Sequence, residues 1–462
     1  MSPLVLGVAL ALPACGSDPV AGADAADTVA DVKHDSVGPP PSPWTVHVIE
    51  DRVAGRQIQA AVLPDGTPVV AAYLEDGADS GDPCDPNSAT GGEQIAWTLQ
   101  YATPSAADLA TWSVEEVAHI VHLGAPRGFD LAIAPDGTPT IAALTGPVSL
   151  PPVPYCGAND VGIYRRSGGT WAVATAVANS NEAATGEPAS DFGNVVGLWP
   201  ALAFDAQGNA FVAYKDVHGG GLQGDDFTRA DLESAWASGA GWRHLPIDWG
   251  KGAGDFSAAA FDKDGRPLVL AFNPRDDLQA SERGLWLYRS DDDGATWKRV
   301  RLFSGGIGER PSLAVAGDGS IWVAWYDGSL GLPYVAHLSD PELFETKASW
   351  DIGDIGDHVF DEGRHPSIAV SAHGVVGVAY QRCGRASDGI GDCNPSKDAV
   401  VFAWQDGAAW EREVVEDEPN GLCGNFATLV FSGESAVVFY QCLVQQGDEF
   451  VSALRAAKRE AL

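Results

Sequence analysis

One unit recurs seven times along this chain, and that repeat limits what the chain can fold into. Each copy has an apolar segment, a short turn with glycine, and a second apolar segment; the first copy, IQAAVLPDGTPVVAAYLED, begins at Ile58. Such a copy is typical of a β-hairpin, because glycine supplies the positive φ angles that tight hairpin turns need. The later copies begin at Phe129, Pro200, Phe256, Pro311, Pro366 and Phe426.

A second pattern follows six of the seven hairpins, in which a tryptophan opens a further strand. An additional apolar strand precedes most of these tryptophans, as in QIAWTLQYA from Gln94. Each unit therefore has four strands, two inner and two outer. The strand-opening tryptophans are Trp112, Trp171, Trp242, Trp297, Trp350 and Trp410.

The seventh hairpin lacks its tryptophan strand, and the chain carries a spare one at its beginning. Only EFVSALRAAKREAL, enough for one strand, follows the last hairpin, whereas Trp44-TVHVI precedes the first. We predict that the N-terminal strand completes the last unit, because this exchange closes a ring and leaves no sheet edge exposed. The predicted fold is all-β, a seven-bladed propeller of four-stranded blades over residues 43–462.

The first 42 residues indicate export. The run Pro3–Leu12 is apolar but too short to span a bilayer, as in a signal peptide. It leads into Leu-Pro-Ala-Cys, which resembles a bacterial lipobox ending at Cys15. The resemblance implies that Cys15 is lipidated and that the protein is anchored at the outer membrane or cell surface. An ordinary signal peptide over residues 1–15 is the alternative. Residues 16–42 lack large apolar side chains and predict a disordered tether.

Composition excludes one class of partner. The chain has 63 acidic and 28 basic residues, a net charge of −35, so nucleic acid is not expected to bind. No cofactor or metal motif is present, and we expect a monomer. Ca²⁺ remains a candidate ligand because carboxylates cluster twice, although neither cluster fits an EF-hand loop. The clusters are Asp76, Asp79, Asp82 and Asp85, and Asp351, Asp354, Asp357 and Asp361.

Six cysteines remain besides Cys15, and an exported chain is expected to oxidise them to disulfides. The sequence allows about 15 pairings. Pairing of neighbours suggests Cys84–Cys156, Cys383–Cys393 and Cys423–Cys442.

Residues 290–297 read SDDDGATW and resemble the Asp-box of sialidases and other BNR-repeat propellers. In that class the motif holds a turn between outer strands, on the face opposite the active site. The resemblance therefore implies a structural role for its residues, which are Ser290, Asp292, Gly294, Thr296 and Trp297.

The opposite face carries recurrent arginines just before inner strands, and it is where we expect the function. Sialidases hold a substrate carboxylate with three arginines there, since guanidinium pairs with carboxylate in a bidentate manner, and use a tyrosine nucleophile. By this resemblance the candidate ligand-binding residues are Arg56, Arg127, Arg310, Arg364, Tyr326 and Asp327. Alternatively, these arginines pair with nearby acids and the tyrosines cap the core.

Three functions follow from these observations. The first is a non-catalytic cell-surface propeller that binds an extracellular glycan or protein on this loop-rich face. The second is a sialidase-like glycoside hydrolase, and the third is a structural component of an envelope assembly. We favour the first, although the fold alone does not choose among them, because propellers serve all three functions.

Overall fold

The computed structural model divides the chain into two units, residues 1–41 and 42–462. It describes parts of the second unit only. The described residues are 42–50, 57–78, 94–123, 127–145, 160–178, 193, 195–219, 225–239, 241–249, 252–274, 282–306, 310–385, 398–407, 409–417, 421–446 and 449–460.

Seven antiparallel four-stranded sheets make up this unit, as predicted. We number them as blades in chain order, each from its innermost to its outermost strand. Blade 1 has β2 (Ile58–Val62), β3 (Pro68–Ala78), β4 (Gln94–Pro104) and β5 (Trp112–Leu123). Blade 2 has β6 (Phe129–Ile133), β7 (Pro139–Leu144), β8 (Val161–Ser167) and β9 (Thr170–Val177). Blade 3 has β10 (Val195–Phe204), β11 (Ala210–Gly219), β12 (Asp225–Ser238) and β13 (Gly241–Asp248).

The remaining blades repeat this order. Blade 4 has β14 (Asp255–Phe261), β15 (Pro267–Asn273), β16 (Gly284–Arg289) and β17 (Lys298–Phe303). Blade 5 has β18 (Ser312–Val315), β19 (Ile321–Asp327), β20 (Leu332–Leu338) and β21 (Asp351–Asp354). Blade 6 has β22 (Phe360–Val370), β23 (Val376–Arg385), β24 (Ala399–Asp406) and β25 (Ala409–Glu416). Blade 7 has β26 (Gly421–Ser432), β27 (Ser435–Gln446), β28 (Glu449–Arg459) and β1 (Trp44–Glu50).

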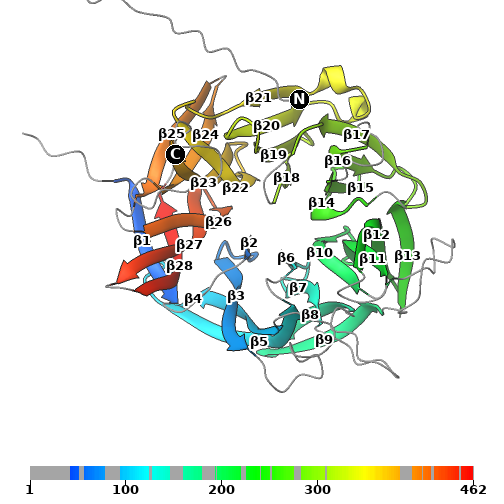
Figure 1. Cartoon of the computed structure of the whole chain (residues 1–462), viewed down its shortest axis with the longest axis horizontal. Helices are drawn as coiled ribbons and strands as arrows, with labels where there is room; N and C mark the ends of the chain where they lie inside the picture. The colour runs from blue at the N-terminus through cyan, green and yellow to red at the C-terminus, as the bar shows by residue number, and fades with distance from the viewer. Residues whose placement is uncertain are drawn as a thin grey trace, which may run out of the picture. The chain divides into compact units, whose positions relative to one another are not determined.

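The blades form a closed ring, which Figure 1 views with the innermost strands toward its centre. Each innermost strand contacts the next, and β26 of blade 7 contacts β2 of blade 1. The strand exchange predicted from the sequence is confirmed, because β1 pairs antiparallel with β28, from Trp44 opposite Arg459 to Glu50 opposite Leu454. The first strand of the ring therefore covers the edge of its last blade.

Each seam between neighbouring blades has an apolar core, and each core includes one strand-opening tryptophan. Trp44 belongs to the core between blades 6 and 7, and Trp112 to the core between blades 7 and 1. The other five tryptophans pack at the other five seams, each against the preceding blade. These tryptophans hold the ring together, since a large aromatic side chain buries much apolar area at each seam.

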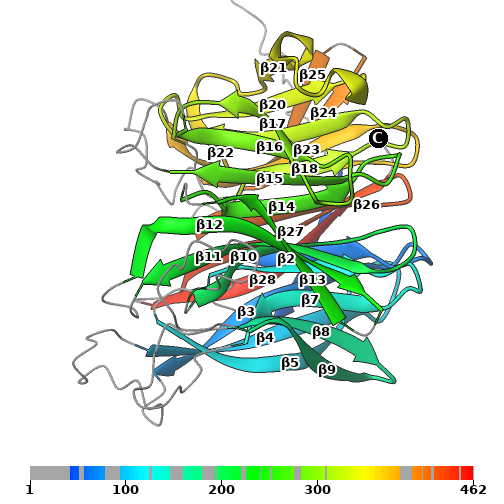
Figure 2. The same cartoon turned by 90° about the vertical axis from the view of Figure 1, so that its right-hand side faces the viewer.

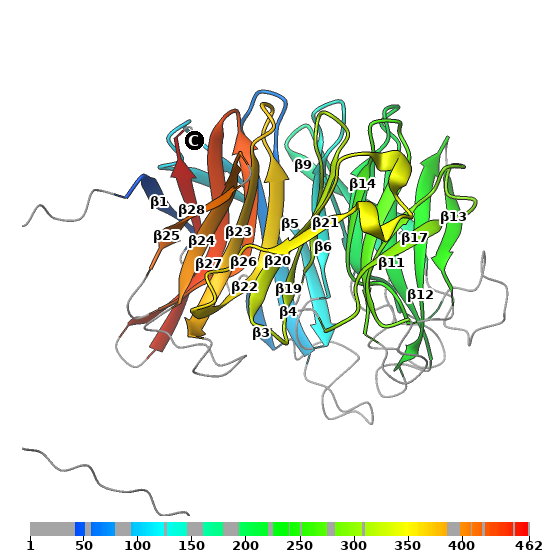
Figure 3. The same ribbon diagram turned by 90° about the horizontal axis from the view of Figure 1, so that it is seen from above.

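The two faces of the ring differ in what connects the strands, as the side views in Figures 2 and 3 let the reader follow. We call one the turn face. It carries the hairpin turns between the first and second strands of each blade, and the glycine of every such turn has a positive φ, as predicted. We call the other the entry face, because each innermost strand begins there.

Helical structure is minor in the described residues. Two short 3₁₀ helices, η1 (Pro341–Leu343) and η2 (Lys347–Ser349), connect β20 to β21. The sequence did not predict them, because three-residue helices leave no periodic pattern. No helix in the described ranges has the length and apolar character needed to cross a membrane.

In every blade, one residue just before or within the first part of the innermost strand has a positive φ between 45° and 99° and takes an equivalent place in the repeat. In blades 3, 4, 6 and 7 this residue lies within a shift of strand register. Register shifts of this kind bend a strand and redirect a side chain. We call these seven residues the entry positions, and they are Gln57, Gly128, Trp199, Phe256, Arg310, His365 and Phe426.

Candidate ligand cavity at the entry face

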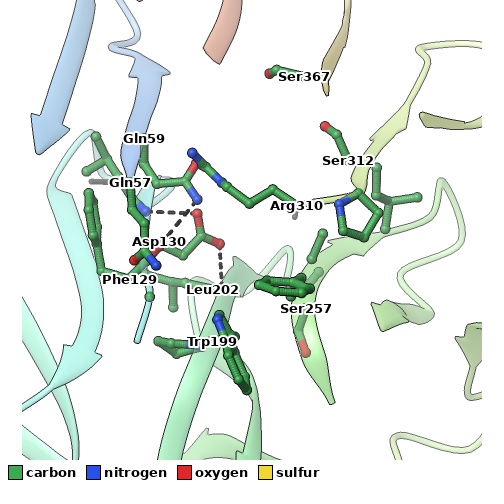
Figure 4. A pocket seen from close by; sticks show the side chains of 18 of the residues that line it. Gln57, Gln59, Phe129, Asp130, Trp199, Leu202, Ser257, Arg310, Ser312 and Ser367 are labelled. Atoms are coloured by element: carbon green, nitrogen blue, oxygen red, sulfur yellow. Dashed lines mark hydrogen bonds between the residues drawn. The ribbon is translucent and has the colours of Figure 1, made fainter. Parts of the chain in front are cut away.

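A cavity of about 240 Å³ lies where the innermost strands begin, and Figure 4 shows its side chains. Its lining comes from all seven blades, so the ring itself creates it. Five of the seven entry positions line it, from Gln57 in blade 1 to Arg310 in blade 5. The positive φ at these positions therefore accompanies side chains that line the cavity, which are those of Gln57, Trp199, Phe256 and Arg310.

Arg310 reaches across the cavity from blade 5. Its Nη2 donates a hydrogen bond of 2.7 Å to the carbonyl oxygen of Ile58 in blade 1, and its guanidinium lies 5.9 Å from the ring centre of Phe426 in blade 7. Figure 4 shows its side chain extended toward Asp130. One side chain thus connects blade 5 with blades 1 and 7.

Asp130 is the acidic partner of Arg310 in this cavity. Its two carboxylate oxygens accept hydrogen bonds from the backbone N–H groups of Leu131, at 2.9 Å, and of Leu202 in blade 3, at 2.7 Å. Burial raises the pKa of Asp130 to about 6, although these bonds and the charge of Arg310 act in the opposite direction. Asp130 is therefore a carboxyl group that changes its charge just below neutral pH.

One part of the cavity wall, from blades 3 and 4, is aromatic. The rings of Trp199 and Phe256 have their centres 5.1 Å apart, and both side chains are half-buried. Lys215 supports this wall from behind: its Nζ lies 5.6 Å from the Trp199 ring centre and 2.5 Å from a carboxylate oxygen of Asp255. The fully buried Lys215 is thus held by a charge partner, as a buried charge must be.

Gly128 is required for this arrangement. Its φ is 99°, and a Cβ added there would lie 2.8 Å from the Cα of Trp199. The backbone N–H of Trp199 also donates a hydrogen bond of 2.6 Å to the carbonyl oxygen of Arg127. Blades 2 and 3 can therefore approach closely only because residue 128 has no side chain.

A belt of polar side chains joins neighbouring blades two residues beyond the entry positions. Gln59 donates to the carbonyl oxygen of Phe129 at 3.3 Å, and Thr428 donates to that of Ile58 at 2.8 Å. Ser312 and Ser367 accept from backbone N–H groups of the following blade. The equivalent residues of blades 3 and 4 are Ala201 and Ala258, so the belt is interrupted beside the aromatic wall.

Three of the arginines predicted for this face lie in the described residues. Arg310 lines the cavity, whereas Arg127 and Arg364 do not. Arg127 and Arg364 lie one residue before the entry positions of their blades, whereas Arg310 occupies its entry position. An offset of one residue turns a side chain to another direction. The Nε of Arg364 lies 3.8 Å from Asp361, and Arg56 is outside the described residues.

Tyr326 and Asp327 lie at the end of β19, away from the cavity lining. The hydroxyl of Tyr326 donates a hydrogen bond of 2.8 Å to Asp361, and Tyr326 is 5% exposed. Burial, and then Asp361, raise the pKa of Tyr326. Asp327 accepts bonds from the backbone and hydroxyl of Ser329, so its carboxylate stabilises its own turn.

Three of the six cysteines predicted to form disulfides lie in the described residues. Cys423 and Cys442 face each other on β26 and β27 and form the predicted disulfide. Cys383 is also disulfide-bonded. Its expected partner Cys393, together with Cys84 and Cys156, lies outside the described residues, so those two pairings stay predictions.

The turn with the Asp-box pattern connects β16 and β17 on the turn face. Ser290 Oγ accepts from the N–H of Gly294 at 2.7 Å, and both carboxylate oxygens of Asp292 accept from Thr296 at 2.7 Å. Trp297 packs in the seam between blades 3 and 4, 6.3 Å from the ring centre of Phe211. These side chains hold a turn and a seam, remote from the cavity.

In the described residues, the carboxylates of the two clusters considered for Ca²⁺ do not come close enough together to share one ion. Asp354 pairs with His358 at 2.9 Å, and Asp357 accepts from the N–H of Val359 at 2.8 Å. In the described ranges, only Glu416, Cys423 and Cys442 bring three potential ligand atoms within 4.8 Å, and both cysteines belong to the disulfide. In the first cluster, Asp79, Asp82 and Asp85 lie outside the described residues, and the side chain of Asp76 is not described.

The sequence predicted a site at this face and named Arg310, which lines the cavity, but it did not name Asp130, Trp199, Phe256 or Gln57. An alignment of the seven hairpins on their turn glycines was the available signal. It places Gln57, Gly128, Trp199, Phe256 and Arg310 at one equivalent position, which a repeat directs to one place.

The chain was compared with protein families, curated proteins and solved structures. No family model matches the chain, and no curated protein matches it by sequence. Several solved structures resemble it at 10–13% identity. The polysaccharide lyase Uly1 has 10% identity over 87% of this chain and 90% of that chain, with a TM-score of 0.48. The Hadza microbial sialidase Hz136 has 12% identity over 88% and 94%, with a TM-score of 0.45. An α-L-arabinanase of Penicillium chrysogenum complexed with arabinobiose has 12% identity over 89% and 97%, with a TM-score of 0.41. Similarity of this degree assigns neither an activity nor a substrate to this chain.

Proposed function

We propose that this protein is an exported, lipid-anchored propeller that binds an extracellular glycan in the cavity at its entry face, without catalysis. The observation that carries the proposal is the division of the cavity into an aromatic wall and a polar side. Trp199 and Phe256 form the wall, and Gln57, Asp130 and Arg310 form the polar side.

A sugar ring matches this division. Its C–H groups form an apolar face that can lie on aromatic rings, and its hydroxyl groups both donate and accept hydrogen bonds. The cavity offers amide, carboxylate and guanidinium groups, which include acceptors and donors. A pocket with apolar walls and a few convergent polar groups is typical of a small-ligand site.

Binding is favoured over hydrolysis by the groups that the cavity presents. Glycosidases use two carboxyl groups, and sialidases use a tyrosine nucleophile. In the described part of the lining, Asp130 is the only carboxyl group and there is no tyrosine. Tyr326 is buried elsewhere with a raised pKa, whereas a nucleophilic phenol needs an accessible oxygen that ionises readily.

A glycan array tests the proposal. The labelled full chain should bind one or more glycans, and Trp199→Ala should reduce that binding at least tenfold, because the aromatic wall is lost. Trp199→Phe keeps an aromatic ring and should retain most of the binding. Melting temperatures of both variants establish that the ring remains folded. No binding by the wild-type chain, or full binding by the folded Trp199→Ala variant, would contradict the proposal.

The lipid anchor is tested separately in a Gram-negative host. We expect the wild-type chain in the membrane fraction, labelled by a radioactive fatty acid. Cys15→Ser should remove the label and release the protein to the soluble fraction. Unchanged fractionation and labelling of the Cys15→Ser variant would reject this part of the proposal.

A further inference from the structure

The cavity has balanced charge. Arg310 and Asp130 are the only charged side chains in its described lining, and they carry opposite charges at neutral pH. A ligand carboxylate that entered would approach Asp130 as well as Arg310. It would lose its hydration without meeting an uncompensated cation, which is unfavourable in a half-buried site.

The contacts of Arg310 also disfavour a carboxylate ligand. A carboxylate is held best by two parallel N–H groups of one guanidinium. Here Nη2 donates to the carbonyl oxygen of Ile58 at 2.7 Å, and the guanidinium lies over the ring of Phe426. Arg310 therefore already serves a contact that spans the cavity.

Long-range electrostatics also disfavour acidic ligands. The chain carries 63 acidic against 28 basic residues, so anions meet a repulsive potential as they approach. A neutral ligand is unaffected by this potential.

The size of the cavity limits how much of a glycan can enter. Its volume is about 240 Å³, slightly below the range of about 300–1,000 Å³ that is typical of small-ligand pockets. That is space for a single sugar ring, with the remainder of a longer glycan outside.

We infer that the cavity selects a neutral monosaccharide residue over the same residue carrying a carboxylate, and that the Asp130–Arg310 pair sets this selectivity. The inference rests on the proposed function, since it names the class of sugar that the same cavity takes. Asp130 acts as the specificity-determining residue because it cancels the charge that would attract an acid.

Matched sugar pairs test the inference. Calorimetry at pH 7.5 compares glucose, galactose and mannose with glucuronic, galacturonic and mannuronic acid, in which a carboxylate replaces the CH₂OH group. The full chain should bind at least one neutral sugar tenfold or more tightly than its acid. If the full chain binds no glycan on the array and none of these sugars, the proposed function fails, and this inference fails with it. If an acid binds as tightly as its neutral partner, or more tightly, the inference alone fails.

The Asp130→Asn variant tests the assignment to one residue. It leaves the charge of Arg310 uncompensated, so the affinity for the acid should rise at least tenfold while the neutral sugar changes much less. Asp406→Asn is the control, because Asp406 is exposed at a hairpin turn and its replacement changes the net charge equally. An Asp130→Asn variant that folds but gains no affinity for the acid overturns the assignment.

Two further measurements do not depend on the folding of that variant. Protonation of Asp130 has the same effect on charge as the substitution, so lowering the pH from 7.5 to 5 should strengthen binding of the acid to the wild-type chain. Arg310 is the charged side chain acting on Asp130, and the pKa of the neighbouring His365 is lowered to about 3 by burial, so His365 stays neutral over this range. Arg310→Gln removes the positive charge and leaves Asp130 as the one charged side chain in the described lining. This variant should therefore bind the acid more weakly than the wild-type chain does. Acid affinities that stay constant in both measurements overturn the inference.

Discussion

At the scale of single residues, the buried acid Glu362 is expected to make the stability of the fold depend on pH. Glu362 is 1% exposed; it accepts a hydrogen bond from the backbone N–H of Asp357 and another from Arg412 at 3.2 Å. Burial raises the pKa of Glu362 from 4.5 to about 7. The folded chain therefore holds this proton more tightly than the unfolded chain does. The stability that results is complete below pH 4.5 and is lost as the pH rises through 7.

Glu362→Gln should remove this loss. The unfolding free energy of the variant minus that of the wild type should therefore increase between pH 5 and pH 8. The size of the pKa shift sets this increase at up to about 3 kcal/mol. Denaturant titrations at several pH values measure the difference. Glu411→Gln, at an exposed position, is the control and should show no such trend. A Glu362→Gln difference that is constant or falls with pH would contradict the assignment.

The residue scale also shows where prediction from the sequence ends. Arg310 was predicted because arginine recurs before inner strands, but Arg127 and Arg364 follow the same rule and do not line the cavity. What separates them is an offset of one residue from the positive-φ entry position. Backbone geometry of that kind depends on the assembled ring, so composition and spacing alone did not reveal it.

At the scale of elements, the strand-opening tryptophans are the parts that the sequence predicted best. Each lies within one residue of the start of an outermost strand and packs on the preceding blade. Trp44 does both in the exchanged strand: its ring lies 5.4 Å from that of Phe402, and its indole N–H donates to Glu413 at 2.8 Å. A repeated tryptophan is visible without coordinates, whereas η1 and η2 connect β20 to β21 without any repeat and were missed.

Trp44→Ala tests the contribution of the exchanged strand. Removal of a buried tryptophan leaves a cavity and costs about 3–5 kcal/mol of unfolding free energy. Val48→Ala on the same strand is the matched control, since Val48 is 47% exposed and its loss should change stability by less than about 0.5 kcal/mol. Equal, small effects of the two substitutions would show that β1 adds little to the last blade.

At the scale of the whole molecule, closure of the ring could be predicted because it is a matter of counting strands. The spare tryptophan strand at the beginning and the missing one at the end determined both the number of blades and the exchange. The cavity could not be predicted in the same way. Its aromatic wall and its Arg310–Asp130 pair come from four different blades, and only the curvature of the ring brings them together.

The central claim is that function resides at the entry face of the closed ring. Hydrogen exchange measured by mass spectrometry, with and without a sugar that binds on the array, tests it most directly. We predict slower exchange in residues 57–62, 128–133, 199–204, 256–260 and 310–315, where the innermost strands begin. Protection confined to the hairpin turns of the opposite face, with none in these segments, would contradict the account.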